Sequence, residues 1–218
     1  MFQHSIFILL VLSNSMVMPI QTLQFCNIIL PAERLVKYRE ANIMNCDYAK
    51  FDENSKYMTN LQNLKITDRS LSAMPAGVFN LKNLTNLDVY DTKIINLGHR
   101  FLLLRKIESL SFVGNHIKKI PLEIFELPEL KSLLIIETDL SELNHSALLA
   151  SNIVELTLLE NKIGLLPRNL CELRIRRIGI FIQNNLEYGQ SLTEYSKRIK
   201  AKIEKMFPRC IVEPYQAP

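Results

Sequence analysis

Five stretches of this sequence repeat one apolar pattern every 23 residues, and this spacing limits the possible folds more than any other feature. Positions 1, 4, 6, 11 and 14 of every frame are apolar. Because hydrophobic residues make up 48% of the chain, chance agreement at all these positions is on the order of 10⁻⁸. A period of this length is typical of a solenoid in which each repeat forms one coil. The matching residues are Leu61, Leu64, Ile66, Leu71 and Met74; Leu84, Leu87, Val89, Ile94 and Leu97; Ile107, Leu110, Phe112, Ile117 and Ile120; Leu130, Leu133, Ile135, Leu140 and Leu143; and Ile153, Leu156, Leu158, Ile163 and Leu166.

The pattern also predicts how each coil is built. Apolar residues at positions 4 and 6 predict a short strand with both side chains pointing into the core. Positions 11, 14 and 19 bring the chain back along the outer side of the coil. No single coil can enclose its own leucines, so stacking against neighbouring coils buries them. Position 19 is Phe79, Leu102, Phe125 and Leu148, and proline follows position 14 at Pro75, Pro121 and Pro167.

From Leu61 to about Leu170 the pattern resembles that of the leucine-rich-repeat family, LxxLxLxxNxLxxLPxxxFxxLxx. The resemblance implies an α/β solenoid, a short curved array with a parallel β-sheet on its concave side. Position 9, asparagine in the family, is Arg69, Thr92, Asn115, Thr138 and Asn161. The ladder of asparagines that links successive coils is therefore incomplete. Threonine can donate and accept hydrogen bonds in a similar place, whereas the pattern does not explain Arg69.

Both ends of the array need a cap, because an open end would expose a layer of leucines. Residues 16–60 predict an N-terminal cap and a degenerate first repeat, in which Tyr38, Ala41, Ile43, Tyr48 and Phe51 keep the register. Residues 61–175 are the repeats, and 176–218 a last irregular repeat and C-terminal cap. Locality favours disulfides that close the two caps, Cys26 with Cys46 and Cys171 with Cys210, among three possible pairings.

A helix is expected over residues 191–207, because Ser191-Leu-Thr-Glu194 forms a capping box and Pro208 ends the run. Apolar residues line one face of it and lysines and arginines fill the rest. The preferred interpretation is a cap over the last coil in a monomer. A dimerisation or membrane-surface helix is the alternative.

The N-terminus predicts export. An apolar run over residues 6–12, followed by Ser13 and Ser15, is typical of a signal peptide over residues 1–15 and is too short to span a bilayer. A buried N-terminal strand is the alternative. Asn83-Leu-Thr and Asn144-His-Ser are glycosylation sequons, which gain weight in an exported chain.

No catalytic, cofactor or metal-binding motif is present in the sequence, so we expect a protein that is not an enzyme and has no cofactor and no metal. The net charge is +4, and the basic excess lies from Arg168 onward, with ten Lys and Arg against five Asp and Glu. Nucleic-acid binding would need a basic stripe across the domain, and none is expected. No further segment is apolar enough to cross a membrane.

The strand positions that the core leaves free predict a binding surface. Position 7, with Leu134 from position 5, gives an apolar column. Position 8 adds a row of acidic residues beside it. An exposed apolar stripe with a charged border is typical of a protein-binding surface, although β-branched residues at position 7 also simply suit a strand. The predicted binding residues are Tyr90, Val113, Leu134, Ile136, Leu159 and Phe181, with Asp68, Asp91, Glu137 and Glu160.

We therefore expect a secreted, extracellular binding protein that recognises a protein partner through its concave face, similar to leucine-rich-repeat proteins of innate immunity or cell-surface signalling. One alternative is a scaffold of the extracellular matrix. Another is an intracellular regulator, if residues 1–15 are not cleaved. The fold hosts many functions and does not name the partner.

Overall fold

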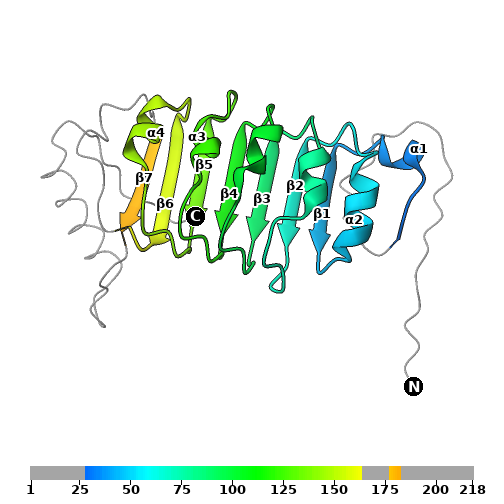
Figure 1. Ribbon diagram of the computed structural model, residues 1–218, viewed down its shortest axis with the longest axis horizontal. Coiled ribbons are helices and arrows are strands. Elements are labelled where there is room, and N and C mark those ends of the chain that lie inside the picture. The colour runs from blue at the N-terminus through cyan, green and yellow to red at the C-terminus, as the bar shows by residue number, and fades with distance from the viewer. Residues whose placement is uncertain (1–27, 164–176, 183–218) are drawn as a thin grey trace, which may run out of the picture.

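The computed structural model describes residues 28–163 and 177–182, which form a row of parallel strands with short helices over one face (Figure 1). These residues contain seven strands, and the strands lie side by side in the order of the sequence. An open parallel sheet in sequence order is what stacked coils produce. The strands are β1 (Glu40–Met44), β2 (Asn63–Thr67), β3 (Asn86–Tyr90), β4 (Ser109–Val113), β5 (Ser132–Ile136), β6 (Glu155–Asn161) and β7 (Arg177–Ile182).

The pairing register reproduces the sequence period. From β1 to β6, each residue pairs with the residue 23 positions later, as Leu64 does with Leu87. The pattern changes at β7, where Leu156 pairs with Ile178 and the register shifts between Leu158 and Asn161. The first six strands thus place equivalent positions in straight rows across the sheet.

Short helical turns return the chain along the other side of each coil. Pro75 and Pro121 immediately precede two of them, because the fixed φ of proline suits a helix start. Asn144 begins another, its Oδ1 accepting from the Ala147 N–H at 2.9 Å. The turns are α1 (Ala32–Leu35), α2 (Tyr48–Ser55), the 3-10 helices η2 (Ala76–Asn80) and η3 (His99–Leu103), α3 (Leu122–Phe125) and α4 (His145–Ala150).

The core lies between the strands and these helices. Every predicted core position within the described residues is buried except Met74, which is half-buried and packs against the core. Leu166 lies outside the described residues. Ala41, Ile43 and Phe51, one period upstream, are buried as well. The core is therefore one continuous stack of coils that begins at β1.

Position 19 is buried at Phe79, Phe125 and Leu148 but differs in one coil. Leu102, at position 19, is 42% exposed, and Phe101 is buried in its place. Phe101 makes edge-to-face contacts with Phe79 at 5.5 Å and Phe112 at 6.2 Å between ring centroids. This coil has Gly98, with a φ of 73°, immediately before its helix, where the coils on either side have a proline. The altered helix start accompanies the one-residue offset of the buried side chain.

Position 9 forms a buried polar ladder in which threonine and asparagine alternate. Asn115 donates its Nδ2 hydrogens to the carbonyls of Val89 and Val113, each at 3.0 Å, and accepts from the Thr92 hydroxyl. Asn161 likewise donates to the carbonyl of Ile135 at 2.8 Å and accepts from the Thr138 hydroxyl at 2.6 Å. Threonine thus substitutes for asparagine in every second coil of the ladder.

The exception at Arg69 has a local explanation. In that coil the preceding residue, Asp68, turns inward and is 2% exposed. Its carboxylate accepts from the Tyr48 hydroxyl at 2.9 Å and from the backbone N–H of Ser70 at 2.7 Å. Arg69 points to solvent and pairs with Asp91 at 3.5 Å. Asp68 therefore supplies the buried acceptor that position 9 supplies in later coils.

Several predicted features lie outside the described residues. These are the signal peptide over residues 1–15, the helix over residues 191–207, and Cys26, Cys171 and Cys210. Cys46 is disulfide-bonded, but its partner is not among the described residues, so the predicted pairing stays a prediction. In the described part of the chain, no helix is long and apolar enough to span a membrane.

Candidate functional site: the open face of the sheet

The candidate site is the face of the sheet that points away from the core, which we call the open face. It is built from positions 3, 5 and 7 of the strands. In β2, for example, Leu64 and Ile66 are buried whereas Lys65 between them is exposed. Strands lie about 4.8 Å apart, so equivalent side chains of neighbouring coils touch along this face. Packing of the core therefore does not determine which residue types occupy these positions.

The structure brings part of the predicted apolar set together. Tyr90 pairs with Val113, and Val113 with Ile136, and all three are half-buried. Leu134, also half-buried, lies two residues before Ile136 on the same face of β5. We call Tyr90, Val113, Leu134 and Ile136 the apolar column.

The predicted continuation of the column is less regular. The backbone of Leu159 pairs with Ile136 in the same register. Phe181 lies in β7, beyond the shift of register between Leu158 and Asn161. The straight row of position 7 is therefore established from β1 to β6.

The predicted acidic row is wrong at one of its four residues, Asp68. Asp91, Glu137 and Glu160 are exposed where their strands end, and we call these three residues the acidic rail. Asp68 does not belong to it, because its carboxylate is buried and hydrogen-bonded within its own coil. The sequence spacing did not reveal that this coil turns differently.

The backbone of the acidic rail is left-handed. The φ angles are 49° at Asp91, 52° at Glu137 and 51° at Glu160, and Gly114 at the same position has 65°. Glycine, asparagine and aspartate suit this conformation, whereas other L-residues lose about 1–2 kcal/mol in it. Two glutamates at such turns are therefore held against the backbone preference.

Position 5 contributes polar groups that sequence reasoning did not single out. Asp88 on β3 is half-buried, and burial raises the pKa of its carboxyl while the positive charge of Lys65 lowers it. The Lys65 ammonium lies over the Tyr90 ring, 4.4 Å from its centroid. Ser111, next to Asp88, is 6% exposed, and its hydroxyl has no hydrogen-bond partner among the described residues. Reading position 5 as a row, as position 7 was read, would have found them.

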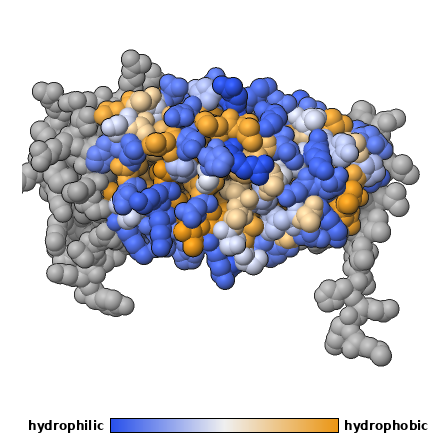
Figure 2. All heavy atoms as spheres, viewed as in Figure 1, coloured by the Kyte–Doolittle hydropathy of each residue, from blue (hydrophilic) through white to orange (hydrophobic). Residues whose placement is uncertain are grey.

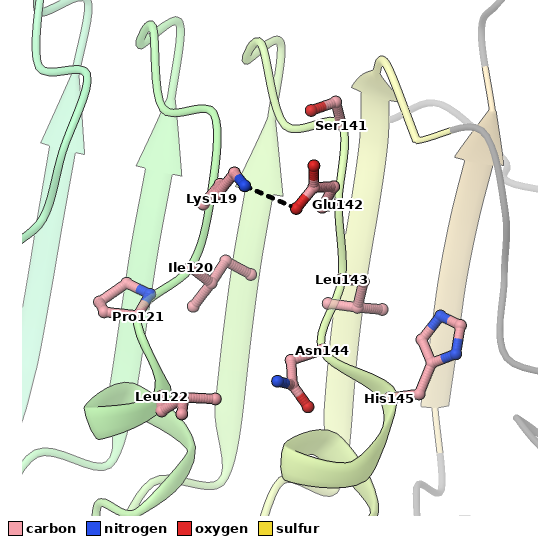
Figure 3. A pocket seen from close by; sticks show the side chains of 9 residues that line it. All are labelled: Lys119, Ile120, Pro121, Leu122, Ser141, Glu142, Leu143, Asn144 and His145. Carbon is pink, nitrogen blue, oxygen red and sulfur yellow. Dashed lines mark ion pairs between the residues drawn. The ribbon is translucent and has the colours of Figure 1, made fainter.

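The helix-bearing face contains a hollow. Figure 2 shows that hydrophobic and polar side chains are interspersed on this face. A hollow of about 680 Å³ lies between the turns before α3 and α4, and a 2.8 Å ion pair between Lys119 and Glu142 crosses one end of it (Figure 3). Leu122 and the exposed sequon residue Asn144 line it. A glycan on Asn144 would stand over this hollow and leave the open face clear.

The two sequons differ in their surroundings. Asn144 uses Oδ1 to cap α4 and is exposed. Asn83 is half-buried, and its Nδ2 donates to the carbonyl of Thr59 at 2.7 Å. Its Oδ1 also accepts from Lys106 at 2.6 Å. Both polar atoms of the Asn83 amide therefore already form hydrogen bonds to residues of neighbouring coils.

Solved structures with this architecture identify the fold. An LRR protein of Leptospira interrogans superposes with a TM-score of 0.62 at 20% identity, over 85% of this chain and 51% of the other. The chain folds as a leucine-rich-repeat solenoid. An internalin of Listeria monocytogenes matches with a TM-score of 0.53 at 20% identity, over 70% of this chain and 44% of that one.

A plant peptide hormone receptor, RGFR1 in complex with RGF2, matches with a TM-score of 0.52 at 20% identity, over 72% of this chain and 26% of the receptor. This chain thus spans about half or less of the length of these leucine-rich-repeat proteins. No family model matches the sequence, and no curated protein does. The likeness therefore establishes the fold, and the family resemblance of the repeat pattern is confirmed at that level.

Proposed function

We propose that this protein is a recognition module that binds a protein or peptide partner on its open face. The apolar column takes an apolar anchor of the partner, and the acidic rail takes basic groups beside it. The observation that carries the proposal is the row Tyr90, Val113 and Ile136, three partly exposed apolar side chains on adjacent strands. The buried core, made by positions 4 and 6, does not require them.

The charge of the open face selects the kind of partner. Between Asn86 and Glu160, positions 3, 5, 7 and 8 carry no lysine or arginine. The same positions carry Asp88, Asp91, Glu137, Glu155 and Glu160. Complementary charge steers association and rejects partners of the wrong sign. A partner with an apolar anchor and a basic border fits this surface best.

Two further observations support the proposal. The left-handed backbone at Glu137 and Glu160 indicates that acidic side chains are kept there despite a conformational cost, as often occurs at functional positions. Among structures of the same fold, RGFR1 with RGF2 and PEPR1 with AtPEP1 are complexes. A ligand of the peptide or protein class is consistent with both observations.

The test is selection of ligands from a library of displayed random peptides on the full chain. Selected peptides should combine apolar and basic residues. They should lose at least tenfold in affinity for Ile136→Asp, because a charge would be buried against the anchor. Leu122→Asp is the matched control, since Leu122 is 49% exposed on the helix-bearing face. Equal loss in both variants, or loss only in Leu122→Asp, would refute the open face as the site.

We also propose that the protein is secreted and carries a glycan on Asn144. The N-terminal apolar run and the exposed position of Asn144 support this. The mass of the native protein before and after deglycosylation, with N-terminal sequencing, tests both points. A retained residue 1–15 segment and free thiols would favour the intracellular regulator, and recovery from insoluble matrix would favour the scaffold.

A further inference from the structure

Ser111 is the most unusual polar residue of the open face. By strand alternation it points to the open face, between Asp88 on β3 and Leu134 on β5. It is nevertheless 6% exposed, because larger neighbours surround its short side chain. In the part of the chain that the structure describes, its hydroxyl has no hydrogen-bond partner. A buried hydroxyl without a partner destabilises the protein, so a ligand group that pairs with it is bound more tightly.

The neighbouring carboxylate is also unpaired. Asp88 is half-buried, and within the described residues it forms no ion pair and accepts no hydrogen bond. Burial raises the pKa of its carboxyl, which means that the folded protein leaves its negative charge incompletely solvated. Asp88 and Ser111 are paired residues on adjacent strands, so one ligand group can reach both.

The chain itself shows which charge this place accepts. The ammonium of Lys65 lies 4.4 Å from the centroid of the Tyr90 ring and acts electrostatically on Asp88. An aromatic face next to a carboxylate favours a cation. Lys65 is exposed and sits one coil to the side, so it does not reach Ser111 across β3. The cation that would satisfy both Asp88 and Ser111 must come from a ligand.

We propose that Asp88 and Ser111 form a subsite for the guanidinium group of an arginine of the partner. A guanidinium is planar and presents several N–H donors in a fixed fork, so it can donate to the Asp88 carboxylate and the Ser111 hydroxyl together. It can also stack on Tyr90, and its methylene stem lies towards the apolar column at Leu134. Lys65 competes for the same electrostatic site. This inference rests on the proposed function and names the chemistry of the basic group that the partner brings.

The experiment uses N-acetyl-arginine amide as the probe, titrated into the full isotope-labelled chain and followed by NMR. The isosteric neutral probe is N-acetyl-citrulline amide, and N-acetyl-lysine amide tests the preference for the fork. The arginine amide should shift the signals of Asp88, Ser111 and Tyr90 and bind at least fivefold more tightly than either other probe. Binding should weaken as pH falls and the Asp88 carboxyl becomes protonated.

Three variants make the assignment specific. Asp88→Asn should weaken binding of the arginine amide at least tenfold, and Ser111→Ala by roughly tenfold, since each loses a hydrogen bond to a charged group. Lys65→Met should tighten binding, because it removes the competing cation. Glu129→Gln is the control: it deletes one exposed acidic charge away from the open face and should change affinity less than twofold.

The proposal is overturned if the citrulline or lysine amide binds as well as the arginine amide, or if Asp88→Asn binds like the unaltered chain. These outcomes are separable from failure of the proposed function. Displayed peptides that need Ile136 but tolerate Asp88→Asn would keep the open face as the site and remove the arginine subsite. If the arginine amide binds at Asp88 but the affinity of displayed peptides is unchanged by Ile136→Asp, the arginine subsite stands and the proposed function of the open face is refuted.

Discussion

The hydroxyl of Thr92 donates a hydrogen bond to Oδ1 of Asn115, which lies at the same position one coil further along the array. Thr92 also accepts from the backbone N–H of Ile94 at 3.2 Å. Both side chains are buried. The pair therefore links two turns of the solenoid inside the core, and Thr138 with Asn161 repeats it two coils later.

We expect Asn115→Ala to lower the free energy of unfolding by about 2–3 kcal/mol, since the carbonyls of Val89 and Val113 each lose a buried hydrogen bond. Denaturant unfolding measures this loss. Lys118→Ala, on an exposed residue of the same turn, is the control and should change stability by less than about 0.5 kcal/mol. If Asn115→Ala lost no more stability than Lys118→Ala, the polar ladder would not stabilise the array.

Gly77 tests the packing of η2 on α2. Its N–H donates to Asp52 Oδ1 at 2.6 Å, and an added Cβ would lie 2.7 Å from both that oxygen and Ser55 Oγ. We expect Gly77→Ala to cost about 1–3 kcal/mol through this steric clash. In Gly98→Ala the added Cβ meets no atom of the described residues within 4 Å, so only the strain of its φ of 73° remains, about 1 kcal/mol. The unfolding midpoints of the two variants show whether the clash at Gly77 destabilises the chain. If Gly77→Ala were as stable as the unaltered chain, the close packing of η2 on α2 would be contradicted.

Asp139 links three coils at the surface and gives a pH dependence of known sign. It accepts from Lys162 and pairs with His116 at 3.0 Å, and hydrogen bonding to these groups lowers the pKa of its carboxyl. A carboxyl with a lowered folded pKa adds stability above its ordinary pKa of about 3.9, and this stability disappears as pH falls through the folded value.

Asp139→Asn should therefore be slightly less stable than the unaltered chain at pH 7, by no more than about 1 kcal/mol because both cationic partners are exposed. The difference should shrink from pH about 4 downward. Thermal unfolding at a series of pH values shows this convergence. A difference that stays constant to pH 2 would mean that the charge of Asp139 is not the cause.

Asp88 should behave in the opposite way. Since burial raises the pKa of its carboxyl, the charged form disfavours folding, and stability falls as pH rises through that pKa. Asp88→Asn should therefore melt at a temperature no lower than the unaltered chain at pH 7, even though it loses affinity for basic ligands. A clear drop in melting temperature would assign Asp88 a structural role.

The regular part of this molecule could be predicted from the sequence because a period fixes many positions at once. Leu64, Leu87 and Leu110 repeat in sequence and lie in one row in the sheet. The exceptions depend on local turn geometry, which a period does not contain. Asp68 turns inward because Tyr48 and Ser70 supply its hydrogen-bond donors, and Tyr48 belongs to a different coil.

The candidate site was predictable in part for the same reason. Position 7 could be read as a row, which gave Tyr90, Val113 and Ile136. The polar pair Asp88 and Ser111 was not predicted as part of the site. What distinguishes these residues is their burial and their lack of hydrogen-bond partners among the described residues, and both depend on the size of neighbouring side chains. The left-handed backbone at Glu137 could not be predicted either, because glutamate, unlike glycine, is not a residue type that indicates this conformation.

Methyl-selective NMR of the full chain with a selected apolar and basic peptide tests the binding role of the open face most directly. The methyl signals of Val113, Leu134 and Ile136 should shift on titration, whereas that of the exposed Leu122 on the opposite face should stay in place. Shifts centred on Leu122 and Leu149, with Val113 and Ile136 unchanged, would contradict it and move the site to the helix-bearing face.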